Sequence, residues 1–176
     1  RISDLFALGV TTEQLELPPL EEIRVTFLEL TTDARDDLEG FRDGDVLKWL
    51  DFSAIIARLD PVALEAAITL VEKDGWYFSW LRFVLLLARA EASLNQQSEL
   101  TLEAIRVLQE ESNPFVGDPR ACDLYNLHPT VASSIHRAFR LIGDDQWYEA
   151  LGSLRATSIN TSTSLMGTMS GPIPAD

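Results

Sequence analysis

The chain is poor in the residues that build metal centres, disulfides and nucleophilic sites. Its 176 residues include one cysteine and two histidines, and Lys and Arg number 14 against 28 Asp and Glu. The single thiol, Cys122, has no partner for an internal disulfide, which favours a reducing, cytoplasmic location. The net charge of −14 repels nucleic acid and anionic lipid at long range, so we expect neither as a partner.

Long hydrophobic runs and strand patterns are also missing. The most apolar stretch, Trp76 to Ala88, contains Arg82 and is shorter than the roughly 20 residues that span a membrane. No segment alternates apolar and polar residues between turn signals. What is present is a hydrophobic fraction of 46%, arranged at helical spacing. We therefore predict an all-α fold without a membrane segment.

Capping residues and apolar spacing divide the chain into helices. Asp45 and Ser98 are expected to cap helices, and Asp60-Pro61 is a typical N-cap followed by a first-turn proline. The predicted helices are 2–8, 12–17, 20–40, 46–58, 61–74, 76–93, 99–111, 130–142 and 145–156. This organisation gives short N-terminal helices in 1–19, a helical domain in 20–156 and a Ser/Thr-rich linker in 157–176.

Apolar stripes on these helices predict the core. The first long helix has apolar residues three or four apart, at Leu20, Ile23, Phe27, Leu30, Ala34, Leu38 and Phe41. Leu64, Ala67, Ile68 and Val71 form a similar stripe. The aromatic run that includes Trp80 and Phe83 surrounds its helix, which favours burial on several sides.

A short pattern recurs in three helices. It reads Leu64-Glu65-Ala66, Leu102-Glu103-Ala104 and Tyr148-Glu149-Ala150, with starts 38 and 46 residues apart and one other helix between each pair. Such spacing is typical of stacked helical hairpins. The bland alternative is that Leu-Glu-Ala is common in any amphipathic helix, because all three are good helix formers.

The last copy resembles a known repeat family. Residues 142–151, Ile-Gly-Asp-Asp-Gln-Trp-Tyr-Glu-Ala-Leu, resemble the turn and second-helix start of a tetratricopeptide repeat, over roughly 130–156. The first helix there lacks the Trp and Leu-Gly residues of that family. The resemblance implies a short array of antiparallel helical hairpins, an α-solenoid. The alternative fold is an irregular helical bundle.

The two sets of helices differ in charge. Helices 46–58, 76–93 and 130–142 carry six basic and two acidic residues, and their partners carry three basic and nine acidic residues. In tetratricopeptide-like arrays the first helices line the concave face, so the resemblance implies a basic groove. We expect an acidic peptide or anionic group to bind there, since arginine holds carboxylates through paired hydrogen bonds. The candidate residues are Arg82, Arg89, His136, Arg137 and Arg140. The alternative is that these arginines cover apolar neighbours or pair with acidic residues of adjacent helices.

Catalytic and metal-binding patterns are weak. Cys122, His128 and His136 have no spacing typical of a metal or nucleophile site, so we expect no metal and no cofactor. The acidic run from Asp33 to Glu39 resembles the Asp-Asp-x-x-Asp/Glu motif of all-α diphosphate enzymes, but Gly40 stands at the third carboxylate. We interpret this run as a solvated helix face.

These observations favour a non-enzymatic interaction or sensing module. The chain resembles the sensor regions of bacterial signal-transducing NTPases, in which helical arrays occur with Ser/Thr linkers. This resemblance implies a sensing role. A start at Arg1 and an end at Pro174-Ala175-Asp176 lead us to expect a fragment of a larger multidomain intracellular protein, whose neighbouring domains are partners too. The alternative is an all-α enzyme or accessory domain that uses the Asp33–Glu39 carboxylates with a divalent metal.

Overall fold

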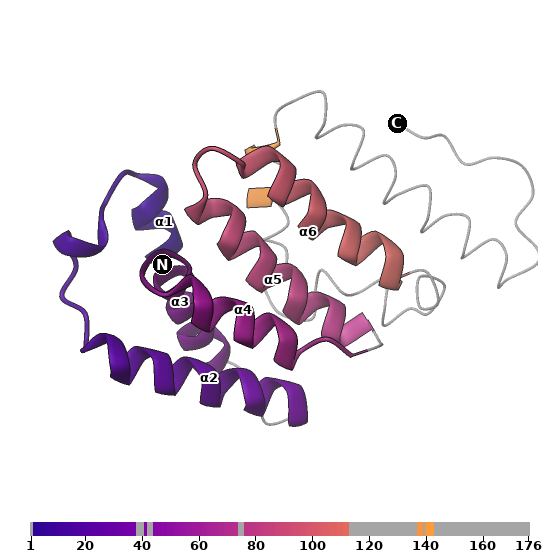
Figure 1. Cartoon of the computed structure of the whole chain (residues 1–176), viewed down its shortest axis with the longest axis horizontal. Coiled ribbons are helices and arrows are strands. Elements are labelled where there is room, and N and C mark those ends of the chain that lie inside the picture. Colours follow the sequence, from indigo (N-terminus) through magenta and orange to yellow (C-terminus); the bar gives the residue numbers. More distant parts are fainter. Residues whose placement is uncertain are drawn as a thin grey trace, which may run out of the picture.

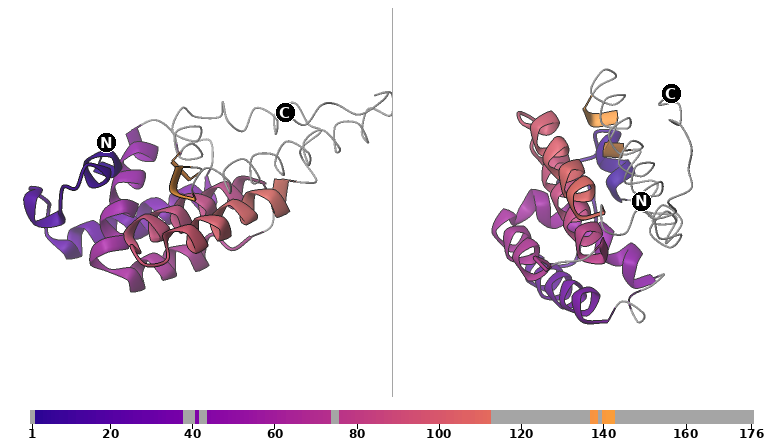
Figure 2. Two further views of the ribbon diagram at one scale, coloured as in Figure 1. Left: turned by 90° about the horizontal axis from the view of Figure 1, so that it is seen from above. Right: turned by 90° about the vertical axis from the view of Figure 1, so that its right-hand side faces the viewer.

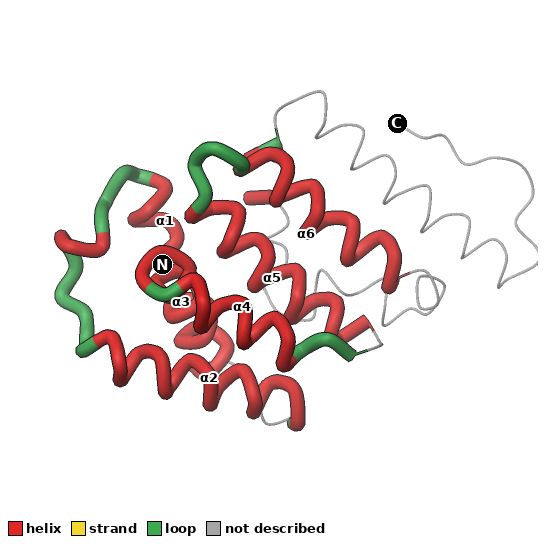
Figure 3. Tube along the Cα trace, viewed as in Figure 1, coloured by secondary structure: helices red, strands yellow, loops and turns green. Residues whose placement is uncertain are grey.

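Helices make up all the regular structure that can be described in this chain. The structure, a computed structural model, describes residues 2–37, 41, 44–73, 76–112, 137, 138 and 140–142, with residues 44, 76, 77 and 108–112 described by backbone alone. The elements in these ranges are α1 (Ile2–Ala7), the 3-10 helix η1 (Thr12–Gln14), α2 (Leu20–Asp36), α3 (Gly44–Leu59), α4 (Pro61–Leu70), α5 (Trp76–Ala92) and α6 (Gln97–Ser112). Figure 3 shows helices and loops over these ranges and no strand, which confirms the predicted all-α class. None of these helices is both long and apolar enough to cross a membrane.

Helices α2 to α5 pack around one core, and α6 lies against α5 (Figure 1). Helix α4 contacts both α2 and α5, and α3 contacts α2, α4 and α5. Helices α5 and α6 share the most extensive contact of the described part and run side by side in Figures 1 and 2. The short connection 93–96 makes this pair an antiparallel hairpin. Helix α1 lies on α3.

The junction of α3 and α4 is a corner. Asp60 is the single residue between Leu59 and Pro61. Antiparallel helix pairs need a loop of about two to five residues, so one residue turns the chain without reversing it. Figures 1 and 3 show α3 nearly end-on where α4 lies across the view. Because α3 and α4 do not form an antiparallel hairpin, the predicted tetratricopeptide-like array of hairpins is not confirmed, although the fold is all-α.

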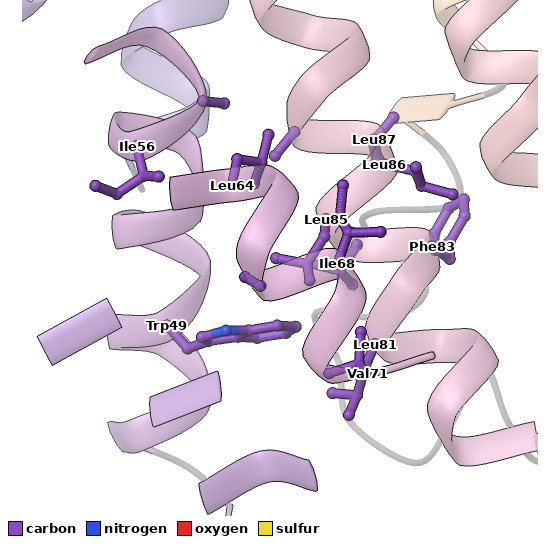
Figure 4. Close-up of a cluster of buried hydrophobic side chains, with 14 of the residues drawn as sticks. Trp49, Ile56, Leu64, Ile68, Val71, Leu81, Phe83, Leu85, Leu86 and Leu87 are labelled. Atoms are coloured by element: carbon purple, nitrogen blue, oxygen red, sulfur yellow. The ribbon is translucent and has the colours of Figure 1, made fainter. Parts of the chain in front are cut away.

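The indole of Trp49 lies at the centre of the core. Figure 4 shows it projecting from α3 toward Ile68, Val71 and Leu81 of the α4–α5 region. Its Nε1–H donates to Thr31 Oγ1 at 3.0 Å, and the Thr31 hydroxyl donates to the Phe27 carbonyl at 2.8 Å. Both polar groups are buried, and this chain of hydrogen bonds satisfies them.

The predicted apolar stripes of α2 and α4 are largely buried in the described core. The buried members of these stripes are Ile23, Phe27, Leu30, Ala34, Phe41, Leu64, Ala67, Ile68 and Val71. Trp80 and Phe83 are buried as expected, with Trp80 2% exposed and its ring centroid 6.2 Å from that of Trp49. Leu20 is only partly buried, and Leu38 lies outside the described residues.

Several predicted helix boundaries were wrong. Helix α2 ends at Asp36 rather than 40, and α4 ends at Leu70 rather than 74. The α4 end is early because the Val71 N–H bonds back to Ile68 at 3.2 Å in a tightened last turn, and the Val71 side chain enters the core. The predicted helix 12–17 is only the single 3-10 turn η1, where the Gln14 side chain accepts the Thr11 N–H at 2.8 Å.

Two caps behave differently from each other. Asp60 is the predicted N-cap of α4, because its side chain accepts the Ala63 N–H at 3.2 Å. Ser98 was wrongly predicted as the cap of α6. The first helical hydrogen bond runs from Leu100 N–H to the Gln96 carbonyl, so Ser98 lies inside the first turn. Its hydroxyl donates instead to the Leu141 carbonyl at 3.5 Å.

Part of the predicted chain lies outside the described residues. This part includes helix 145–156, most of helix 130–142, the Ser/Thr-rich segment 157–176, Cys122 and both histidines. The third copy of the Leu-Glu-Ala pattern belongs to it. The two described copies are not equivalent, because Ala66 is exposed and Ala104 is fully buried.

Candidate functional site

Arg89 of α5 holds two carboxylates that come from two other helices. Its Nη1 donates to Glu65 Oε1 of α4 at 3.2 Å, and its Nη2 donates to Glu103 Oε2 of α6 at 2.9 Å. The side chains of Arg89, Glu65 and Glu103 are 25%, 56% and 53% exposed. Exposed ion pairs stabilise a fold by only about 0.2–1 kcal/mol, so water and other carboxylates compete readily for this guanidinium.

Arg137 forms a more buried pair with Glu91 of α5. The Glu91 Oε1 atom accepts from Arg137 Nη2 at 2.8 Å and from Nε at 3.3 Å. The two side chains are 21% and 13% exposed. Ala138 and Ile142 are buried in the core, and the Leu141 carbonyl accepts the Ser98 hydroxyl of α6 at 3.5 Å, so these described residues pack against the α5–α6 hairpin. This pair joins a segment distant in sequence to the bundle.

The structure places the predicted binding arginines in different surroundings. Arg82 is half-buried on α5, Arg140 is exposed, and His136 lies outside the described residues. For Arg89 and Arg137 the alternative interpretation, pairing with acidic residues of adjacent helices, describes the contacts that they make. Partner binding by the five candidate residues stays a prediction.

Acidic residues of adjacent helices were predicted as alternative partners of these arginines, but the sequence did not identify which carboxylates they are. Glu65 and Glu103 occupy the same position of the Leu-Glu-Ala pattern, and both meet Arg89. The recurring Glu was visible in the sequence, but the pattern did not show that both copies contact one arginine. No sequence pattern indicated that Glu91 pairs with Arg137, because the two residues are 46 positions apart in the sequence.

The carboxylates of the enzyme alternative do not converge in the described residues. Asp36 is paired with Arg35, whose Nε lies 2.8 Å from Asp36 Oδ1, and this hydrogen bond lowers the pKa of the Asp36 carboxyl. Asp33 is exposed, and Glu39 lies outside the described residues. Among the residues that the structure describes, no three His, Cys, Asp or Glu side chains are grouped to hold a metal ion.

A second surface was missed in the sequence, where α1 lies on α3. The Ile2 N–H donates to Asp51 Oδ1 at 3.3 Å, and the Arg58 guanidinium lies 3.9 Å from the centroid of the Phe6 ring. Arg58 Nη1 also donates to the Ala54 carbonyl at 3.0 Å, which fixes the guanidinium. Burial lowers the pKa of Arg58. The i, i+7 spacing of Asp51 and Arg58 places both on one face of α3.

Comparisons with known proteins give no assignment for this geometry. No family model matches the chain, and no curated protein or solved structure matches it either.

Proposed function

We propose that the chain is a non-enzymatic interaction or sensing module that binds an acidic segment of another protein. The supporting observation is the environment of the half-buried Arg89, whose two amino groups each hold a carboxylate from a largely exposed side chain. A planar guanidinium held in this way has the geometry that recognises carboxylates. A partner carboxylate replaces an exposed internal pair at a small loss of free energy.

Arg140 is the second residue that supports the proposal. It lies three residues after Arg137, and its side chain is exposed. The Arg137–Glu91 pair and the burial of Ala138 anchor this segment to the α5–α6 hairpin. An incoming acidic segment would therefore meet Arg140 on a fixed support, which reduces the entropy lost on binding. Arg82, which is half-buried on α5, is a further proposed member of the site, and the predicted member His136 lies outside the described residues.

Fluorescence anisotropy with labelled synthetic peptides tests the proposal on the full chain. We expect an acidic helical peptide to bind better than a scrambled neutral peptide, despite the net charge of −14. Arg140→Glu should weaken that binding by about tenfold, roughly 1.4 kcal/mol. Arg106→Glu makes the same charge change at an exposed position of α6 and is the matched control. Equal binding of acidic and neutral peptides, or equal losses in both variants, would overturn the proposal.

A further inference from the structure

Glu91, near the end of α5, holds a guanidinium from a distant part of the chain. Its Oε1 atom accepts hydrogen bonds from Arg137 Nη2 at 2.8 Å and from Arg137 Nε at 3.3 Å. The two donors belong to one planar group, so together they fix its orientation as well as its position. The Glu91 carbonyl accepts the side-chain amide of Gln97 at 3.2 Å, which ties Glu91 to the start of α6. The carboxylate is therefore a fixed support for Arg137.

Uncharged contacts hold the described residues that follow Arg137. Ala138 and Ile142 are 0% and 3% exposed and belong to the core, and the Leu141 carbonyl accepts the Ser98 hydroxyl at 3.5 Å. These contacts determine which face of the segment is buried. The Arg137–Glu91 pair adds a charged contact at the edge of that face, where the two side chains are 21% and 13% exposed.

Arg140 lies one helical turn after the pair. Arg137, Ala138, Arg140 and Leu141 all have helical backbone, and the Arg140 side chain is exposed. Residues three apart are neighbours on a helix surface, and like charges at this spacing repel each other. Because Glu91 neutralises Arg137, the pair both fixes this turn of helix and removes the repulsion that Arg140 would otherwise meet.

We propose that Glu91 is a positioning residue for the acidic-segment site. Through Arg137 it fixes the turn of helix that presents Arg140 to the partner, and Arg137 supports that turn without binding the partner itself. This inference rests on the proposed function and deepens it, because it gives different roles to two arginines that the sequence predicted as equivalent binding residues.

The effect of removing the Glu91 charge distinguishes these roles by its sign. Glu91→Gln removes one negative charge from a chain of net charge −14, which by itself favours binding of an acidic peptide. It also releases the Arg137 guanidinium. If Arg137 bound the partner, the substitution would therefore strengthen binding. If Glu91 positions Arg140, the substitution weakens binding, because Arg140 must then be ordered when the partner binds.

Fluorescence anisotropy of the full chain with the acidic helical peptide measures this sign. We expect Glu91→Gln to raise Kd about two- to tenfold, the cost of ordering one long side chain and its turn. Arg140→Gln should cost less in the Glu91→Gln chain than in wild type, because both substitutions remove one contact. Glu99→Gln makes the same charge change at an exposed position of α6 and should not weaken binding. Tighter binding by Glu91→Gln, or additive effects of the two substitutions, would overturn the inference.

Limited trypsin digestion tests the support without any peptide. Trypsin cleaves after arginine, and Arg140 and Arg106 of α6 are both exposed on helical backbone. Glu91→Gln should speed cleavage after Arg140 at least about threefold, since the cleavage rate follows the population of the locally opened form. Cleavage after Arg106 should keep its wild-type rate. An unchanged rate after Arg140, or equal acceleration at both sites, would show that Glu91 does not fix this turn specifically.

The two experiments separate this inference from the proposed function. If the acidic peptide does not bind wild type, the proposed function fails, and faster cleavage after Arg140 in Glu91→Gln still establishes that Glu91 fixes this turn. If the peptide binds wild type and Arg140→Glu weakens that binding, the proposed function stands. Unweakened binding by Glu91→Gln would then contradict the positioning role alone.

Discussion

Arg24 of α2 and Asp60, the N-cap of α4, form an ion pair in which Arg24 Nε lies 2.5 Å from Asp60 Oδ2. The other carboxylate oxygen, Oδ1, accepts the Ala63 N–H at 3.2 Å. One side chain thus caps α4 and joins its start to α2. The hydrogen bond from Arg24, followed by that from the Ala63 N–H, lowers the pKa of the Asp60 carboxyl.

Asp60→Ala should destabilise the fold because it removes both the cap and the ion pair. Loss of an N-cap costs about 0.5–2 kcal/mol, and loss of the partly buried ion pair adds about 1 kcal/mol. Urea unfolding followed by circular dichroism measures the loss. Asp60→Asn should lose less, since Asn is also a good N-cap. Asp36→Ala, which breaks an exposed pair with Arg35, is the control and should change little. Equal losses for Ala and Asn at position 60 would show that the cap contributes nothing.

The same carboxylate predicts a pH dependence. Its pKa is lower in the folded chain than the ordinary value of about 3.9 in the unfolded chain. Its stabilisation is therefore complete above that ordinary value and disappears as the pH falls through the folded value. We expect the free energy of unfolding of wild type to fall below about pH 4, and that of Asp60→Asn to fall less steeply. Parallel curves for the two proteins would contradict the assignment.

Local chemistry allowed much of this fold to be predicted. Two features depend only on neighbours within a few residues and can be predicted from the sequence. They are the apolar stripe from Ile23 to Ala34 and the start of α4 at Asp60-Pro61. The Ser98 prediction failed because α6 begins at Gln97, with Leu100 N–H donating to the Gln96 carbonyl, so that Ser98 lies inside the first turn. The predicted end of α4 was also wrong. The side chain of Val71 packs in the core and its N–H bonds back to Ile68, so the helix ends early.

The candidate site was harder to predict than the core. Arginine positions are visible in a sequence, but their partners depend on which helices are neighbours. Arg89 lies between α4 and α6, and only the three-dimensional arrangement pairs it with Glu65 and Glu103. The contact of Phe6 with Arg58 depends likewise on α1 folding back onto α3. Charge patterning identified which helices are basic and gave no information on which charges are already neutralised.

Thr31→Val should destabilise the chain although it preserves side-chain shape. It removes the acceptor of the Trp49 indole N–H, a 3.0 Å hydrogen bond at a buried site. A buried donor without a partner costs about 1–3 kcal/mol. Thr31→Ser keeps the hydroxyl and should lose less. Thr32→Val is the matched control, because the neighbouring Thr32 hydroxyl bonds only to the Leu28 carbonyl of its own helix and is half-buried. Chemical denaturation curves that rank Thr32→Val as the worse variant would refute this account of the core.

Ala66 and Ala67 offer a test of the α4 packing face. Ala67 is fully buried and Ala66 is exposed on the same helix. Ala67→Leu forces extra methylene groups into a packed core, which costs about 1–3 kcal/mol or more. Ala66→Leu adds the same atoms at the surface and should leave the free energy of unfolding nearly unchanged. Similar effects of the two substitutions would mean that α4 has a different orientation.

Trp80→Ala should be the most destabilising of these substitutions. The Trp80 side chain is 2% exposed and contacts the central Trp49 ring at a centroid distance of 6.2 Å. Removing a buried Trp costs about 3–5 kcal/mol, a large share of the roughly 5–15 kcal/mol that stabilises a typical domain. For a chain of this length each kcal/mol lowers Tm by about 2–4 °C, so thermal unfolding should shift by about 6–20 °C. Leu94→Ala is the control, because Leu94 is 83% exposed and its truncation should leave Tm almost unchanged. A nearly unchanged Tm for Trp80→Ala would place this ring on the surface, where it would be available to a partner.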